Sequence, residues 1–253
     1  MLEILVLSIT QGITEFLPIS STAHLILISE FLNYKNENLT IDISLHLGSL
    51  IAVIFFFKKE IISFMDNKSL FFKVSIGALP TLIIGFLMIK LNLIEFFRNA
   101  YIISFTTIFF GVLLYFADKS VIKKNNINNI SLKDSIYIGL MQCISLIPGV
   151  SRSGITITGA RFLNFNRIDS AKIAFLFSIP TLIAVSTYGI LKLVELKNLN
   201  ITANNFWAMV FSFIFSLIAL KIFIKYLKKF SLFIFVFYRI ILGVVIFIYV
   251  YLS

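Results

Sequence analysis

Residues 11–24 read QGITEFLPISSTAH, and residues 142–154 read QCISLIPGVSRSG. These two stretches, the first and the second motif, are polar interruptions in a strongly apolar chain. Each contains a proline, which halts a helix, a cluster of hydroxyl side chains and one charged residue, Glu15 or Arg152. A charged side chain inside a membrane is costly and is usually kept for function. The two motifs are therefore candidate functional segments.

The composition predicts an integral membrane protein of the all-α class. Hydrophobic residues make up 59% and charged residues 13% of the 253, whereas a soluble domain has about half apolar and a quarter charged residues. The net charge of +10 would suggest nucleic acid in a soluble protein. Here the basic residues lie between apolar segments, where they orient membrane spans, so we expect membrane lipids and no nucleic acid as partners.

The apolar segments predict six transmembrane helices, because a span needs roughly 17–25 mainly apolar residues. They lie at about 41–57, 72–89, 101–117, 171–191, 203–222 and 232–252. The segments around the motifs, near 1–31 and 134–163, are each expected to form a helix, a polar turn and a second short helix. Neither half is long enough to cross, which favours a re-entrant hairpin sheltered inside protein; a straight kinked span is the alternative.

The motifs also predict an internal repeat within a single membrane domain, 1–253. Gln11 aligns with Gln142 and Ser20 with Ser151 at an offset of 131 residues, and residues 48–53 align with 179–185. Two halves result, about 1–120 and 132–253, each a hairpin followed by three spans. Because three crossings are an odd number, the second half enters the membrane in the opposite orientation, which makes an inverted-topology repeat.

The distribution of basic residues agrees with this topology. Fifteen are expected on one side: Lys58, Lys59, Lys68, Lys73, Lys119, Lys123, Lys124, Lys133, Arg161, Arg167, Lys172, Lys221, Lys225, Lys228 and Lys229. Five are expected on the other: Lys35, Lys90, Arg98, Lys192 and Lys197. By the positive-inside rule the first side is cytoplasmic, both termini face outward, and Arg152 and Arg239 remain as intramembrane arginines.

Opposed hairpins would bring both motifs into one site suited to an anion. Ser20, Ser21 and Thr22 begin one short helix and Ser151, Arg152 and Ser153 begin another, with Thr156 one turn further on. Helix N-termini favour negative charge, and an arginine fork binds phosphate oxygens in bidentate fashion. The alternative is that the hydroxyls only cap helices and that Arg152 pairs with Glu15.

Two further side chains suggest catalysis. Glu15 is the only carboxylate of the motifs, so it is expected to be a base, a metal ligand or both. His24 suits proton transfer, whereas His46 begins a span with no motif around it and is expected to be structural. Arg239, in the last span, is expected either to support the site or to pair with a backbone carbonyl.

The two motifs resemble the signature motifs of the undecaprenyl-diphosphate phosphatase family, the bacitracin-resistance type of membrane pyrophosphatase, and the resemblance spans the whole chain. It implies hydrolysis of the polyprenyl (C55) diphosphate carrier to its monophosphate and inorganic phosphate. This would occur at the outer face of the cytoplasmic (inner) membrane, recycle the carrier for peptidoglycan synthesis and confer bacitracin resistance. It also implies a divalent cation, Mg²⁺ or Ca²⁺. A second copy of the chain, forming a homodimer, is among the partners considered.

Carried over by position, the resemblance implies that Glu15 is the essential carboxylate, Ser21 the motif serine, His24 the histidine and Arg152 the phosphate-binding arginine. The side chains expected to bind substrate are Gln11, Ser20, Thr22, Ser151, Ser153, Thr156 and Arg239. Many members have a second glutamate where this chain has Gln11. Because an amide cannot act as a base, Glu15 would act alone, and it is also the expected metal ligand.

Two mechanisms and one other function stay open on the sequence alone. Either Ser21 attacks the terminal phosphorus, assisted by His24 or Glu15, or a metal-bound water activated by Glu15 does so. Broken helices in an inverted repeat are also how secondary transporters are built, so a flippase or transporter of polyprenyl phosphate is the alternative to a phosphatase. A channel or a purely structural subunit would leave the paired motifs unexplained.

Overall fold

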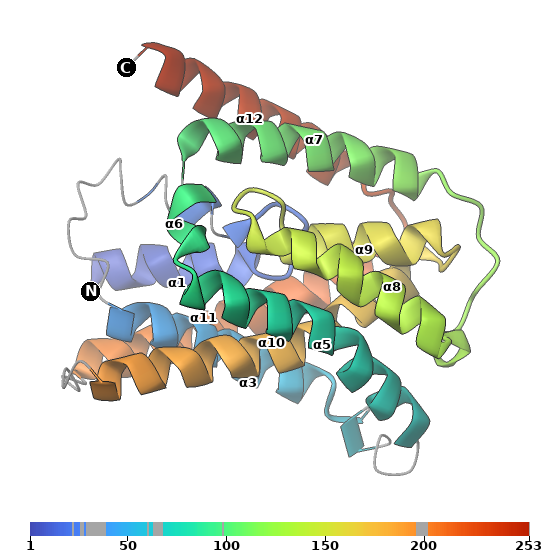
Figure 1. Cartoon of the computed structure of the whole chain (residues 1–253), viewed down its shortest axis with the longest axis horizontal. Helices are drawn as coiled ribbons and strands as arrows, with labels where there is room; N and C mark the ends of the chain where they lie inside the picture. Colours follow the sequence, from blue (N-terminus) through green and yellow to red (C-terminus); the bar gives the residue numbers. More distant parts are fainter. Residues whose placement is uncertain are drawn as a thin grey trace.

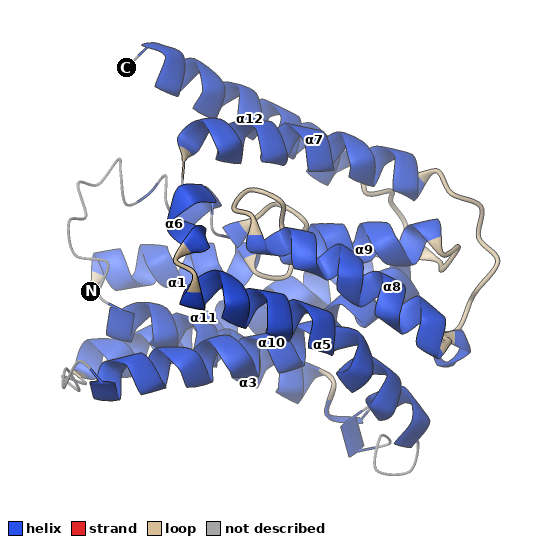
Figure 2. Cartoon of the chain, in the orientation of Figure 1, coloured by secondary structure: helices blue, strands red, loops and turns tan. Residues whose placement is uncertain are grey.

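The structure, a computed structural model, describes residues 1–21, 23–25, 28, 39–59, 61–62, 68–97, 99–195 and 202–252. These residues form helices and loops and contain no strand (Figure 2). The predicted all-α class is therefore confirmed for this part of the chain. The predicted site residue Thr22, the second half of the first hairpin beyond residue 28, and the basic residues Lys35, Arg98 and Lys197 lie outside the described residues.

Six of the described helices are long and apolar enough to cross a membrane, in agreement with the six predicted spans. They are α3 (Leu39–Phe56), α5 (Lys68–Lys90), α7 (Ala100–Asp118), α10 (Arg167–Glu195), α11 (Ala203–Leu227) and α12 (Phe233–Leu252). Large apolar side chains are exposed along their outer faces, among them Phe86 on α5, Phe105 on α7 and Ile222 on α11. Such faces suit contact with lipid acyl chains.

The remaining helices are short. They are α1 (Leu2–Thr14), α6 (Leu93–Phe97), α8 (Leu132–Cys143), α9 (Arg152–Phe162) and the 3₁₀ turns η1 (Ile127–Asn129) and η2 (Ile144–Leu146). As expected, α1 ends before Pro18, and α8 with η2 ends before Pro148. The start of α8 has a capping box, in which the side chains of Ser131 and Asp134 each bond the other's backbone N–H.

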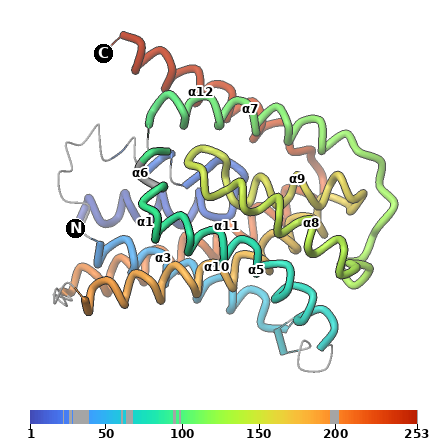
Figure 3. The backbone as a smooth tube through the Cα atoms, viewed as in Figure 1, coloured from blue at the N-terminus to red at the C-terminus, as the bar shows by residue number. Residues whose placement is uncertain are grey.

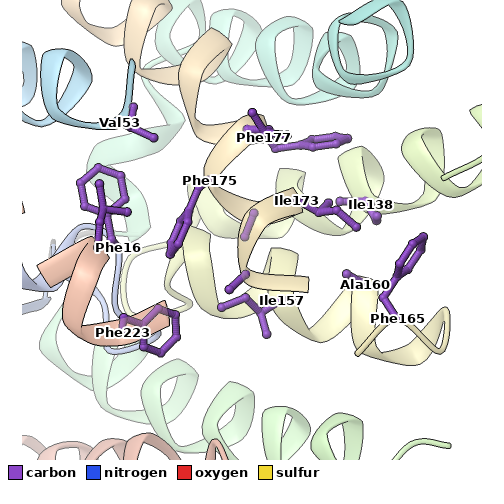
Figure 4. Close-up of a cluster of buried hydrophobic side chains, with 14 of the residues drawn as sticks. Phe16, Val53, Ile138, Ile157, Ala160, Phe165, Ile173, Phe175, Phe177 and Phe223 are labelled. Carbon is purple, nitrogen blue, oxygen red and sulfur yellow. The ribbon is translucent and has the colours of Figure 1, made fainter. Parts of the chain in front are cut away.

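The helix α10 lies at the centre of the bundle and packs against α3, α5 and α9. It is the most buried of the six long helices. Its Phe175 ring lies 5.7 Å from that of Phe16 in the first motif and 6.0 Å from that of Phe223 on α11, centroid to centroid (Figure 4). The first motif is therefore anchored to the apolar core at Phe16, next to Glu15. Helices α7 and α12 pack side by side along one edge (Figures 1 and 3).

An ionic cluster joins the end of α7 to the loops beside it. The Asp118 carboxylate accepts two bonds from Arg167, at 2.6 and 3.0 Å, and one from the backbone of Leu232 at 3.1 Å. Arg161, which is 1% exposed, donates to the carbonyls of Asp118, Ser120 and Phe165. All three charged residues lie outside the motifs, so the cluster holds the loops around α9 in place.

Candidate active site

The two motifs meet in the middle of the bundle, where their loops lie together (Figure 1). The Ser153 hydroxyl donates to the carbonyl of Leu17 at 2.8 Å. The Arg152 guanidinium bonds the Glu15 carboxylate, with 2.5 Å between Nη2 and Oε1. Residues 136 and 137 positions apart in the chain are thus in contact, and the predicted convergence of the motifs is present.

Both motifs turn through backbone conformations that L-residues rarely adopt. Ser20 has φ = 71° and Ser151 has φ = 70°, and each precedes a helical segment. Each serine also caps its own helical segment, because Ser20 Oγ accepts from the Ala23 amide at 3.5 Å and Ser151 Oγ from the Gly154 amide at 3.1 Å. Strain of this kind costs about 1–3 kcal/mol per residue and clusters at functional sites.

Gly149 gives the second motif its tight turn. Its φ is 89°, and a Cβ there would overlap the Thr106 hydroxyl and come within 2.7 Å of the Ile103 carbonyl. Only glycine adopts this positive φ without strain and has no Cβ to cause the overlap. The turn therefore sits directly against α7, which fixes the position of Arg152.

Glu15 stands at the centre of the polar contacts. Its Oε1 accepts from Arg152, and its Oε2 accepts from Gln11 Nε2 at 2.9 Å and from Ser21 Oγ at 3.0 Å. The Glu15 side chain is 6% exposed and that of Arg152 16%. The Arg152–Glu15 ion pair weighed as an alternative is therefore present, and the serines do cap helices; these same residues also line a cavity.

That cavity has a volume of about 190 Å³. It is smaller than the roughly 300–1,000 Å³ of pockets for drug-sized ligands, so it fits a compact head group and no long lipid chain. The residues lining it are Thr14, Glu15, Ser20, Ser21, His46, Thr81, Ser145, Leu146, Ile147, Gly149, Ser151, Arg152, Thr181, Leu182 and Val185. Five of the predicted site residues are among them: Glu15, Ser20, Ser21, Ser151 and Arg152.

His24 is not among these lining residues. Its Nδ1 lies 2.6 Å from the Ser20 carbonyl oxygen, and its Nε2 lies 2.5 Å from the Tyr238 hydroxyl on α12. Both ring nitrogens are thus engaged beside the first motif. Tyr238 was not expected at the site, and its position next to Arg239 in the last span was the only sequence feature pointing to it.

His46, which the sequence did not mark as functional, lines the cavity from α3. Its Nδ1 lies 3.1 Å from Gln11 Nε2, and Gln11 is fully buried. Since no motif surrounds His46, only the packing of α3 against α1 brings it to the site.

Among the remaining predicted residues, Thr156 and Arg239 bond backbone carbonyls of the second motif. Thr156 donates to the Arg152 carbonyl at 2.7 Å. Arg239 is fully buried and donates to the carbonyls of Gly149 at 3.0 Å and Thr107 at 3.1 Å. Arg239 therefore pairs with backbone carbonyls and holds the Gly149 turn, and Thr156, Ser153 and Arg239 are absent from the described residues lining the cavity.

The donors fit a divalent cation only in part. No three His, Cys, Asp or Glu side chains among the described residues form a cation site. Mg²⁺, however, is often held by one or two carboxylates together with substrate phosphates and water. Glu15 alone can supply that carboxylate, since it lies in the cavity beside Arg152.

Comparison with known proteins finds relatives over nearly the whole chain. The chain is 43% identical to an undecaprenyl-diphosphatase of Pelagibacter ubique over 251 residues, covering 99% of this chain and 98% of that protein. It is 38% identical to undecaprenyl-diphosphatases of Alteromonas mediterranea and Campylobacter curvus, with 96% of each chain covered in both cases. The family model for bacitracin resistance protein BacA matches residues 4–245. The protein is therefore a multi-pass membrane protein that belongs to the BacA family of bacitracin resistance proteins.

Proposed function

We propose that the protein is an undecaprenyl-diphosphatase, which hydrolyses the C55 polyprenyl diphosphate to the monophosphate and inorganic phosphate. One observation carries the proposal: a carboxylate, a hydroxyl and an arginine, Glu15, Ser21 and Arg152, lie in hydrogen-bonding contact in a cavity of head-group size. A clamp for transport needs the arginine but has no use for a hydroxyl bonded to a carboxylate. The names of the relatives agree with a phosphatase.

In the proposed reaction, the diphosphate takes over the guanidinium of Arg152 and so releases Glu15. Glu15 then accepts the proton of the Ser21 hydroxyl, to which it is already bonded at 3.0 Å. Ser21 Oγ forms a bond to the terminal phosphorus as the bond from that phosphorus to the bridging oxygen breaks. The lipid monophosphate leaves with that proton, and Glu15 then takes a proton from the water that attacks the phosphoserine and passes it to Ser21 Oγ, which regenerates Ser21 and releases inorganic phosphate. In the alternative, water activated by Glu15 attacks directly.

A divalent cation, Mg²⁺ or Ca²⁺, would be held by Glu15 together with oxygens of the diphosphate. When bound, it neutralises charge that develops on the phosphoryl oxygens. Arg152 and the strained helix starts at Ser20 and Ser151 supply the same kind of stabilisation from the protein itself.

The architecture proposed is two re-entrant hairpins in an inverted repeat. Helices α1, α8 and α9 have 13, 12 and 11 residues, fewer than the roughly 20 that a crossing needs. Two helix contacts correspond to each other at the motif offset of 131 residues, that of α1 with α11 and that of α8 with α5. In the first contact Ser8 bonds the Ala208 carbonyl at 3.3 Å. In the second, Gly139, which is 131 positions after Ser8, lies against Gly77, which is 131 positions before Ala208.

The site is proposed to open to the outer face of the cytoplasmic membrane. By the positive-inside rule, the side with fifteen basic residues is expected to be cytoplasmic, and the first motif is expected to enter from the opposite side. Hydrolysis there would return the carrier lipid for peptidoglycan synthesis. We also propose that the activity confers bacitracin resistance, in line with the family name. The exposed apolar helix faces leave room for a homodimer.

The decisive experiment is phosphate release from undecaprenyl diphosphate by purified protein in detergent, where no two sides of a membrane exist. We expect release with Mg²⁺ or Ca²⁺ and a loss of at least about 10²-fold in E15Q and R152A, since each removes a group that acts on the transition state. Absence of release under any cation would refute the phosphatase and favour a flippase.

The serine and water mechanisms separate in the variant S21A. We expect a large fall in kcat for S21A and recovery of phosphoserine from rapidly quenched wild-type enzyme. Turnover of S21A close to that of the wild type would remove the serine nucleophile and leave the water route.

A further inference from the structure

His46 is the histidine that lines the cavity, whereas His24 is turned toward Tyr238. It reaches the site from α3, outside both motifs. Its one described hydrogen-bonding contact joins its Nδ1 to the amide nitrogen of Gln11 at 3.1 Å. The same amide nitrogen bonds Glu15 at 2.9 Å. Gln11 therefore links His46 to Glu15.

The donor and the acceptor of each hydrogen bond between His46, Gln11 and Glu15 follow from the chemistry of the groups. The Glu15 carboxylate, which is paired with Arg152, can only accept hydrogen bonds. The group of Gln11 that faces it must therefore be the NH₂, which carries two hydrogens. One of them points to Glu15, and the other is available to His46 Nδ1. Nδ1 then accepts a bond, so the proton of the neutral ring is on Nε2.

The contacts of His24 require the opposite tautomer. Its Nδ1 faces the Ser20 carbonyl, which only accepts, so Nδ1 carries the proton. Its Nε2 then accepts from the Tyr238 hydroxyl. The chain has two histidines in all, and their contacts call for opposite tautomers.

We propose that His46 is a substrate-binding residue, held by Gln11 as the Nε2–H tautomer, which donates a hydrogen bond to a phosphoryl oxygen of the diphosphate. This rests on the proposed function and deepens it. A neutral imidazole N–H that is fixed in place stabilises charge developing on oxygen without a proton transfer. The amide at position 11 then has a role of its own, because a carboxylate there would accept from Nδ1–H and reverse the tautomer.

The proposal is tested without turnover by ¹⁵N NMR of the full-length protein labelled at histidine in detergent. We expect one ring protonated at Nε2 and one at Nδ1, and H24Q should remove the Nδ1-protonated ring and so assign it. Inorganic diphosphate should shift the Nε2 signal of His46 and leave that of His24 in place. Two rings of the same tautomer, or no shift of His46 on adding diphosphate, would overturn the proposal.

The role of Gln11 is tested in the same way with Q11E. We expect the His46 proton to move to Nδ1, or the ring to become doubly protonated, because the new carboxylate accepts a bond from that nitrogen. A His46 ring that stays singly protonated at Nε2 in Q11E would show that Gln11 does not set the tautomer.

Measurements of kcat/KM then test whether His46 acts as a hydrogen-bond donor to the substrate. H46F keeps a ring and removes the donor, so we expect kcat/KM to fall by about 10²-fold, the usual effect of one such donor. H46Q keeps both an acceptor for Gln11 and an N–H donor and should retain most of the activity. Equal losses in H46F and H46Q would contradict the donor role.

The matched control is S49A on the same helix. Ser49 is buried and bonds Ser212 and Ser216 on α11, away from the cavity, so S49A should lower stability and leave kcat/KM near the wild-type value. If the protein released no phosphate at all, the proposed reaction would fail, and the NMR result would still decide the tautomer of His46 and its contact with diphosphate.

Discussion

At the scale of single residues, the largely buried ion pair of Glu15 and Arg152 is the main feature of the candidate site. A buried ion pair adds little stability over packed apolar side chains, so its presence among apolar helices is better explained by function. While paired, Arg152 occupies Glu15 Oε1 and Ser21 occupies Oε2. In the proposed reaction, an incoming diphosphate competes for the arginine and frees Glu15 to accept the proton of Ser21.

This exchange predicts that R152K is a poor enzyme although it keeps the charge. Lysine is a point charge and lacks the planar fork that holds two phosphate oxygens at once. We expect kcat/KM for undecaprenyl diphosphate to fall by at least about tenfold, or 1.4 kcal/mol, in a phosphate-release assay. Activity equal to that of the wild type would show that Arg152 does not bind phosphate through its fork.

The matched control is R167K. Arg167 also holds a carboxylate, that of Asp118, with two bonds, but it does so in the ionic cluster at the end of α7. We expect R167K to lower the midpoint of thermal unfolding and to leave kcat/KM unchanged in the protein that remains folded. A fall in kcat/KM as large as that of R152K would mean that loss of any bidentate arginine disables the enzyme through its fold.

At the scale of elements, the crossing of α5 and α8 sets the distance of the second motif from the rest of the bundle. A Cβ on Gly139 would overlap the carbonyl oxygen of Gly77, and one on Gly77 would come within 2.6 Å of the Ser135 carbonyl. The helix backbones therefore touch directly. Close packing through small residues is the usual basis of helix association in membranes.

We therefore predict that G139A destabilises the protein in detergent, by about 1–3 kcal/mol as for other overpacked sites. The measurement is the midpoint of unfolding followed by fluorescence or by the loss of soluble protein on heating. G159A on α9 is the control, since its Cβ would meet Met141 at an ordinary 3.4 Å. If G139A unfolded at the same temperature as G159A, the helices would not need this contact.

At the scale of the whole molecule, the charge asymmetry predicts the orientation in the membrane. The loop between α7 and α8 carries several of the fifteen basic residues expected in the cytoplasm, and the segment before α11 is expected on the opposite side. The chain has one cysteine, Cys143, so single-cysteine variants are simple to build. In a C143S background, we expect a membrane-impermeant maleimide to label A203C and not K123C in intact cells.

Labelling of K123C after permeabilisation is the control for reactivity. Labelling of K123C but not A203C in intact cells would invert the topology and place the cavity's first motif on the cytoplasmic side. Labelling of both would break the proposed inverted repeat.

The six spans and the two motifs could be predicted because they depend on local sequence. A run of about 20 apolar residues is long enough to cross a bilayer wherever it packs, and Pro18 and Pro148 end helices through their own ring geometry. The ends of spans were less well predicted: α10 runs over Arg167–Glu195 rather than 171–191, because polar residues at the interface can continue a helix beyond its apolar part.

Apolar length, proline and charge are local properties of the chain, so the sequence was enough to predict the class of protein, the six long apolar helices and the residue types of the candidate site. Which side chains face the cavity depends on how the helices pack. This packing turns His24 toward Tyr238, 214 positions away, and brings His46 to Gln11 from another helix. The physical reason is that a side chain's direction depends on how its helix is rotated against its neighbours. Close contacts between helices, as between Gly139 on α8 and Gly77 on α5, restrict such rotations, and they join segments distant in the chain.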